Sequence, residues 1–348
     1  MTLAREIASL AEVRSLAMTL LNDLETLMPS QQKNNKQRIL ELIGENGFIL
    51  IFIIWIIFLS LTTTTFLKPQ NIFTVLRQAA IVSIAAIGEM LVMLLGGMDV
   101  SIAALLGFSG IVGVSLMVRY GMDPMLAGLV CVLVGGLIGF INGILVTKVR
   151  INSVIATLGV MTVLNGVALW YTQGKTIVGP QLDKIAFLSR GYIGPIPVPV
   201  VLMFLFYLIF YLVLNKTVFG ARIYAIGNNE KASWLAGMKV DRLKILAFTT
   251  AGFLGGFGGL LQASRQGSAT SSMGNEFLFP ILTAVILGGI SLSGGKGKIE
   301  NTLIAAIFLM TITNGMVLLG ISLYVQGVIS GLILIIALSL DRLRYRKR

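Results

Sequence analysis

Long apolar runs recur along almost the whole chain of 348 residues. Several reach about 20 residues, the length that a helix needs to cross the hydrocarbon core of a bilayer. Hydrophobic residues make up 56% of the chain and charged residues 12%, and the mean hydropathy is +0.90. Continuous runs, unlike alternating ones, favour helices that satisfy their own backbone hydrogen bonds over a barrel. The sequence therefore predicts an all-α polytopic membrane protein.

Apolar windows predict ten transmembrane helices. They cover residues 48–66, 74–97, 100–118, 125–147, 152–171, 196–214, 243–263, 277–292, 302–319 and 323–340. Two of the windows are rich in glycine, "LVGGLIGFINGILV" and "AGFLGGFGGLL". Glycines in such runs let neighbouring helices approach closely.

Positive charge is distributed unevenly between the two sides of these predicted spans. If the N-terminus is cytoplasmic, 20 of the 27 Lys and Arg residues fall in or beside inside segments and 7 in outside ones. Cytoplasmic loops carry such an excess of Lys and Arg, so both termini are predicted to be cytoplasmic. This orientation also accounts for the net charge of +12 without a nucleic-acid partner.

The predicted spans divide the chain into three parts. Residues 1–45 form a cytoplasmic amphipathic segment and linker, residues 46–342 the transmembrane domain, and residues 343–348 a basic cytoplasmic tail. Apolar residues from Leu3 to Leu27 recur at helical spacing, and the signature of a signal peptide is absent. This N-terminal helix either packs on the protein itself or contacts a partner or the membrane surface.

Two connections between predicted spans are long. Residues 172–195 form the longest outside loop, a candidate lid or docking surface. Residues 215–244 form the longest cytoplasmic loop, and they include "AIGNNEKASWLAGMKVDRLK". The helix signals in this loop are an N-cap at Asn228 or Asn229, an acidic Glu230 and a C-cap glycine at Gly237.

These signals predict a short cytoplasmic helix at residues 230–236. It would expose Trp234 and Leu235. An exposed apolar pair on an ordered loop indicates a partner, although the helix can instead fold against its own bundle or lie in the headgroup region.

Asp99 follows a glycine pair in "LLGGMDVSIAALLGFSG", residues 94–110. If the flanking apolar runs are separate spans, Asp99 caps the helix that follows. If they form one broken element, Asp99 and Ser101 line a cavity at membrane depth, where discontinuous helices mark substrate sites. The sequence leaves both interpretations open.

Further polar residues lie inside predicted spans, where they form either a path or interhelical hydrogen bonds. Glu89 is the costliest of them to bury. They are Gln78, Ser83, Glu89, Asn142, Asn165, Gln262 and Asn314.

The composition excludes several kinds of catalytic site. The chain has no His and a single Cys, Cys131, which excludes His-dependent catalysis, HExxH metal sites and an intrachain disulfide. "LGGISLSGGKGK" at residues 287–298 fails the phosphate-loop pattern because Ile290 and Gly297 occupy positions that require Gly and Ser or Thr. No catalytic residue, metal site or nucleotide site is therefore predicted.

Several motifs together resemble the permease subunits of bacterial sugar ABC importers of the ribose, galactose, arabinose and xylose group. The resemblance covers residues 45–342. The motifs are "GGMDVSIAALLGFSG", "NGILVTKVRINSVIATLG", "TQGKTI", "NKTVFGARIYAIGNNEKASWLAGMKV", "GGFGGLLQASRQGSATSSMGNEF", "LTAVILGGISLSGGKG" and "NGMVLLGIS".

The resemblance implies a protein of the bacterial inner membrane with about ten helices per subunit. It implies as partners a second permease subunit, identical or different, cytoplasmic ABC ATPases, an external sugar-binding protein and membrane lipid. ATP would be bound by the partner ATPase, so the chain would need no cofactor of its own. The chain departs from many relatives in carrying Leu278 and Pro280 at commonly polar positions and in its long N-terminal segment.

The resemblance also implies roles for individual residues. Coupling to the ATPase would involve Asn228, Asn229, Glu230, Ala232, Trp234 and Gly237. Candidates for the translocation path are Glu89, Asp99, Ser101, Asn142, Asn165 and Gln262.

Three alternatives compete with this interpretation. An ion-coupled secondary transporter would use Glu89 and Asp99 as its coupling groups. An intramembrane enzyme would need a converging nucleophile and base, and the sequence shows no such spacing. A structural or receptor subunit would not need polar residues in so many spans.

Overall fold

The computed structural model describes the backbone of residues 35–345 and the side chains of residues 48–339. The predicted amphipathic helix of residues 1–30 and the last three residues of the basic tail lie outside the described residues. The chain divides into two units, Met1–Gly47 and Phe48–Arg348. Of the first unit the structure describes only the start of one helix, and the following account concerns the second unit.

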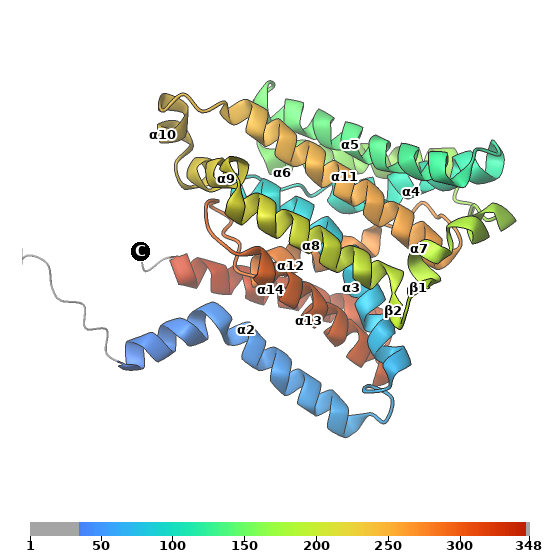
Figure 1. Cartoon of the computed structure of the whole chain (residues 1–348), viewed down its shortest axis with the longest axis horizontal. Coiled ribbons are helices and arrows are strands. Elements are labelled where there is room, and N and C mark those ends of the chain that lie inside the picture. The colour runs from blue at the N-terminus through green and yellow to red at the C-terminus, as the bar shows by residue number, and fades with distance from the viewer. Residues whose placement is uncertain (1–34, 346–348) are drawn as a thin grey trace, which may run out of the picture. The chain divides into compact units, whose positions relative to one another are not determined.

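The described residues are almost entirely helical (Figure 1). Two 3₁₀-helices, η1 (Pro180–Ile185) and η2 (Asn275–Phe277), and one antiparallel hairpin of β1 (Tyr192–Ile193) and β2 (Ile196–Pro197) accompany the α-helices. The α-helices are α2 (Asn35–Thr62), α3 (Pro69–Leu94), α4 (Ile102–Arg119), α5 (Pro124–Thr147), α6 (Ser153–Thr172), α7 (Phe187–Arg190), α8 (Val198–Lys216), α9 (Val218–Asn228), α10 (Glu230–Leu235), α11 (Val240–Gln266), α12 (Leu278–Leu287), α13 (Ile299–Leu318) and α14 (Leu323–Tyr345).

Seven helices among the described residues are long and apolar enough to cross a membrane. They are α3, α4, α5, α6, α8, α11 and α13, and each lies at one of the predicted spans. The other three predictions coincide with shorter apolar segments at Phe48–Thr62, Asn275–Leu287 and Leu323–Ser339. The prediction of a polytopic helical membrane protein is confirmed.

The predicted span at residues 277–292 is wrong in its C-terminal part. Helix α12 ends at Leu287, and residues 288–298 contain no helix. Gly289 has a φ of +84°, and the amides of Gly289 and Ile290 donate to the carbonyls of Ile286 and Val285, which is the pattern of a Schellman stop. Apolar composition continues past this glycine pair, so the hydropathy window overran the end of the helix.

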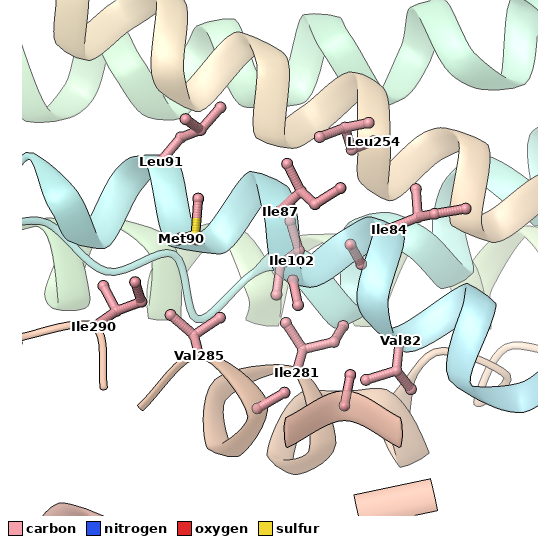
Figure 2. Packing of buried hydrophobic residues seen from close by; sticks show 14 of the residues in the cluster. Val82, Ile84, Ile87, Met90, Leu91, Ile102, Leu254, Ile281, Val285 and Ile290 are labelled. Carbon is pink, nitrogen blue, oxygen red and sulfur yellow. The ribbon is translucent and has the colours of Figure 1, made fainter. Parts of the chain in front are cut away.

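Helix α3 forms the centre of the second unit. Every residue from Ala79 to Leu94 is buried, and α3 contacts α8, α11, α12 and α13. Figure 2 shows Ile84, Ile87 and Met90 of α3 packed among residues of α4, α11 and α12. A helix that is apolar on all sides belongs in the interior of a bundle.

Glycines bring the backbones of α5 and α11 into contact. A Cβ atom on Gly135 would lie 2.3 Å from the carbonyl oxygen of Gly252, and one on Gly139 would lie 2.2 Å from that of Phe248. Gly143 continues this series at the same helical spacing and faces the backbone of Ile245. Small residues one turn apart let membrane helices pack at backbone distance, so these glycines fix the α5–α11 pair.

Other faces of the helices carry exposed apolar side chains. Leu129, Leu133 and Leu137 of α5 are exposed, as are Leu205 and Leu208 of α8. Such surfaces suit contact with lipid tails, which are as apolar as leucine.

The predicted outside loop 172–195 is largely ordered by contacts with α11. Ser189 donates to the carbonyl oxygen of Leu261, and Ser264 donates to that of Ile185, at 2.6 and 2.7 Å. Ile177 and Ala269 form a β-bridge. The loop, η1 and α7 therefore cover the C-terminal end of α11, at the opposite end of this unit from α9 and α10 (Figure 1).

We expect Gly139→Ala to destabilise the protein, because the new methyl group would overlap the carbonyl of Phe248 and force α5 away from α11. Overpacking of this kind costs about 1–3 kcal/mol. Thermal unfolding in detergent measures the effect. Gly166→Ala in α6 is the matched control, since a Cβ atom there meets nothing within 4 Å. Equal melting temperatures for the two variants would contradict this account of the interface.

Candidate functional site

The link between α3 and α4, residues 95–101, has no helical structure, yet side chains satisfy four consecutive backbone amides in it. The amide of Met98 donates to Ser153 Oγ at 3.1 Å, and that of Val100 donates to Thr157 Oγ1 at 3.0 Å. The amide of Asp99 lies 3.1 and 3.2 Å from the two carboxylate oxygens of Glu89. The amide of Ser101 donates to Asp99 Oδ1 at 2.9 Å. Irregular backbone is tolerated within a membrane bundle only when it is satisfied in this way.

Asp99 itself is fully buried in the same network. Its Oδ1 accepts the hydroxyl of Ser101 at 2.5 Å, and the amide nitrogen of Asn142 lies 3.2 Å from Oδ2 and 2.8 Å from Ser101 Oγ. The side-chain oxygen of Asn142, Oδ1, is buried without a partner. The structure thus brings together Glu89, Asp99, Ser101 and Asn142, four of the six predicted path residues.

The structure shows which helices flank Asp99. The flanking helices are separate, and each is long enough to span a membrane. The N-cap of α4 is Ser101, and the Asp99 carboxylate accepts the Ser101 amide and no amide of α4. Through Asn142 the same carboxylate joins the α3–α4 link to α5.

A cavity of about 350 Å³ adjoins the network. Gly96, Gly97 and Ser153 line it together with Lys244 and Phe248 of α11. Binding pockets for small ligands begin near this volume, at roughly 300 Å³. The cavity is therefore a ligand-sized space that borders the α3–α4 link, and its lining residues do not include Glu89 or Asp99.

Gln262 lies far from this network, in a second polar group near the C-terminal end of α11. Its amide nitrogen donates to Glu276 Oε1 at 3.1 Å, and its own Oε1 is buried without a partner. Arg265 interacts electrostatically with both Glu276 and Arg77. Arg77 was not among the predicted site residues, because its charge was assigned to an outside segment. Its position inside the predicted span 74–97 was the available signal.

The remaining polar candidates do not join either group. Asn165 is half-buried on α6, about two turns beyond Thr157. Asn314 and Asn71 exchange amide hydrogen bonds of 2.9 and 3.0 Å, so Asn314 fits the interhelical alternative. Cys131 is a free, buried thiol, and no group of metal-ligating side chains occurs in the part of the chain that the structure describes.

The predicted cytoplasmic helix is present as α10. Asn229, not Asn228, is its N-cap, and its side chain accepts the amide of Ala232 at 2.9 Å. Gly237 has a φ of +80° and ends the helix in a Schellman motif with Met238, whose amide donates to Ser233. Trp234 and Leu235 are 65% and 70% exposed, which leaves an apolar pair facing away from the rest of this unit.

Helix α9 precedes α10 and was missed in the predicted loop 215–244. Thr217 caps it by accepting the amide of Gly220, and its buried residues Ile223 and Ile226 lie three positions apart. A Thr cap followed by this apolar spacing is the signal that the sequence offered.

The C-terminal end of α9 meets the α3–α4 link at a junction of glycines. A Cβ atom on Gly227 would lie 1.9 Å from the carbonyl oxygen of Leu94 and 2.4 Å from the amide nitrogen of Gly295. The Gly295 amide donates to that same Leu94 carbonyl at 2.8 Å. We call Leu94, Gly227 and Gly295 the glycine junction.

Tyr224 connects α9 to the loop of residues 288–298, which also contains Gly295. Its hydroxyl donates to the carbonyl oxygen of Gly297 at 3.1 Å. Burial raises the pKa of Tyr224, and the negative charge of Glu300 raises that pKa further. The phenol therefore stays protonated and keeps donating across the physiological pH range.

We expect Thr157→Val to destabilise the α3–α4 link, because the Val100 amide loses its acceptor while the side-chain volume is nearly unchanged. A buried amide without a partner costs about 1–3 kcal/mol. The free energy of unfolding reports the loss. Thr162→Val on the exposed side of α6 is the control, since its hydroxyl bonds only its own helix; the same loss in both variants would contradict the role given to Thr157.

Comparisons with known proteins identify the family. Residues 71–338 match the family described as "Branched-chain amino acid transport system / permease component". The ribose import permease protein RbsC of Bacillus subtilis (strain 168) is 40% identical over 319 residues, which cover 91% of this chain and 98% of that protein. The L-arabinose ABC transporter permease protein AraH of Azospirillum brasilense is 34% identical over 311 residues, which cover 88% of this chain and 90% of that protein.

The D-allose transport system permease protein AlsC of Escherichia coli (strain K12) is 34% identical over 297 residues, which cover 85% of this chain and 90% of that protein. No solved structure matches the chain. Because the family match covers most of the chain and these relatives align over nearly their whole lengths, the chain belongs to this permease family: it is a multi-pass bacterial membrane protein and a transport subunit, not an enzyme.

Proposed function

We propose that the chain forms the translocation path of an ATP-driven importer for a sugar of the ribose, arabinose or allose type. The observation that carries this proposal is the near full-length similarity to permeases named for these three sugars. Family membership also removes the basis for the ion-coupled and enzymatic alternatives.

We also propose how the chain is oriented in the membrane. Lys148, Arg150, Lys239 and Arg242 lie at the end of the bundle that carries α9 and α10. Under the positive-inside rule this end faces the cytoplasm. We propose ten spans in this orientation, with residues 1–45 and 343–348 as cytoplasmic segments and residues 46–342 as the permease domain.

The proposed role as an ATP-driven importer also implies partner proteins for the chain. An ABC ATPase would bind and hydrolyse ATP on the cytoplasmic side, and an external binding protein would deliver the sugar. A second permease subunit and the lipid bilayer would surround the exposed apolar faces. The chain itself would hold no cofactor.

The surface of α10 supports its assignment as the site that docks the ATPase. Asn229 and Gly237 fix the two ends of this short helix, and Glu230 joins it to α11 through Lys244 at 2.7 Å. A helix held this firmly presents Trp234 and Leu235 as a preformed apolar contact, and tryptophan is enriched among residues that dominate binding energy.

The glycine junction supports a route from α10 to the membrane interior. Helix α9 leads from α10 to Gly227, which touches the backbone of Leu94 at the start of the α3–α4 link. The link continues through Gly96 and Gly97, which line the cavity, to Asp99. We assign Glu89, Asp99, Ser101 and Asn142 to the wall of the path, where they hold the link in place.

Reconstitution tests the proposed function. The chain, its copurifying ATPase and the binding protein would be placed in proteoliposomes and supplied with radiolabelled ribose, arabinose or allose. ATP-dependent accumulation of at least one sugar is expected. Absence of a copurifying ATPase, or ATP hydrolysis without uptake of any of the three sugars, would overturn the proposal.

We expect Trp234→Ala to weaken binding of the ATPase to the chain by about thirtyfold, because truncation of a central tryptophan costs about 2 kcal/mol or more. Quantitative pull-down from gently extracted membranes measures it. Trp170→Ala is the matched control, since Trp170 is 78% exposed on α6, within a predicted span. Undiminished binding by Trp234→Ala would contradict the docking role.

We expect Gly227→Ala to lower sugar uptake to below about a tenth of the wild-type rate while the ATPase still copurifies, because the new methyl group would separate α9 from Leu94 without touching α10. Uptake and ATP hydrolysis would be measured in parallel in proteoliposomes. Gly327→Ala on α14 is the control, since a Cβ atom there meets nothing within 4 Å. Normal uptake by Gly227→Ala would argue against transmission through the glycine junction.

A further inference from the structure

We propose that Arg77, Gln262 and Glu276 form a binding site for a neutral polyhydroxyl solute at the end of the bundle opposite α10. This inference rests on the proposed function and names the groups that receive the solute from outside. It is carried by the buried polar atoms at this end that have no partner.

Arg77 lies in α3, shortly before its fully buried stretch from Ala79 to Leu94, and is itself partly buried. Two full turns of helix separate it from the first residue, Pro69. A charged residue inside a membrane helix is costly and marks a functional site when it faces the bundle interior. Arg265 is attracted to Glu276 and repelled by Arg77. Its backbone carbonyl oxygen accepts from Arg190 at 3.2 Å, two residues before Tyr192, so charges from α3, α11 and η2 lie close together here.

One donor and one acceptor in this group are unsatisfied. The Arg77 Nε–H is buried without a hydrogen-bond partner, and so is Gln262 Oε1. Gln262 cannot satisfy its oxygen by turning its amide, because its nitrogen already donates to Glu276 at 3.1 Å. Buried polar groups normally find partners, and a bound solute would supply both.

The combination of a free donor and a free acceptor selects the chemistry of that solute. A hydroxyl group can accept from Arg77 Nε–H and donate to Gln262 Oε1, whereas an ionised carboxylate group can only accept. The Gln262 oxygen and the Glu276 carboxylate would repel an anion, and Glu276 also offsets the positive charge of Arg265. The arrangement therefore fits a neutral sugar better than a sugar acid or a phosphorylated sugar.

Aromatic side chains border the same group. The Arg77 guanidinium lies 4.9 Å from the ring centroid of Tyr192 in β1, and Phe73 packs edge-on against that ring at 6.2 Å. These contacts hold the guanidinium in place before the solute arrives. Tyr192 is 48% exposed, so the site borders the surface that faces away from α10.

Transport in proteoliposomes tests the site, with ribose, arabinose and allose as probes and with saturating loaded binding protein. Arg77→Gln and Gln262→Met each remove one unsatisfied atom. We expect both to lower the sugar taken up per ATP hydrolysed at least tenfold, while the ATPase continues to copurify. Arg119→Gln is the matched control, because Arg119 lies over Tyr171 at the same 4.9 Å but outside the group, and it should keep uptake within twofold of the wild type.

The outcomes separate the two proposals. If the wild type accumulates none of the three sugars, the proposed function and this site are both overturned. If the wild type transports but both variants match it, or if Arg119→Gln loses as much, only the site is overturned. Inhibition of wild-type ribose uptake by ribose 5-phosphate more strongly than by unlabelled ribose would overturn the neutral character of the ligand. The two variants are independent, so failure of one to assemble leaves the other as the test.

Discussion

The non-helical link between α3 and α4 lies inside the bundle only because side chains replace the water that its amides would otherwise bind. Ser153 and Thr157 of α6, Glu89 of α3 and Asp99 of the link itself supply the acceptors. An unsatisfied amide in hydrocarbon costs several kcal/mol, so the link, the cavity beside it and the start of α4 depend on these acceptors together. The buried carboxylates are part of the architecture as well as candidates for the path.

Close backbone contact is the second constraint on this fold. Along α5 and α11 glycines remove side chains where two spanning helices meet, and lipid provides no hydrophobic force that would hold such helices together otherwise. The same device recurs at the glycine junction, where the ends of α3 and α9 meet the loop of residues 288–298. In both places the packing depends on the absence of a Cβ atom, which explains why a chain with 39 glycines can still form a specific bundle.

Hydropathy predicted the long helices well because a run of about 20 apolar residues in the local sequence determines both that a segment can enter lipid and how long its helix is. It failed at residues 288–292, where apolar character continues past a helix stop, and it passed over α9, which lies outside the apolar runs. Asp99 and Asn142 were predicted as polar residues of a path, but their meeting in one network joins positions 43 residues apart, which no local pattern contains. Arg77 was missed because charge was counted by side of the membrane and not by depth within a helix.

The glycine junction has a consequence for how motion would pass through the protein. Side-chain contacts can absorb small displacements, because χ angles rotate between staggered wells at little cost. The contacts among Leu94, Gly227 and Gly295 join backbone to backbone, where no χ angle intervenes and the peptide units resist deformation. A shift of α9 would therefore reach the C-terminal end of α3 through main-chain contact, and a tilt of the short helix α10 would act on the start of the α3–α4 link.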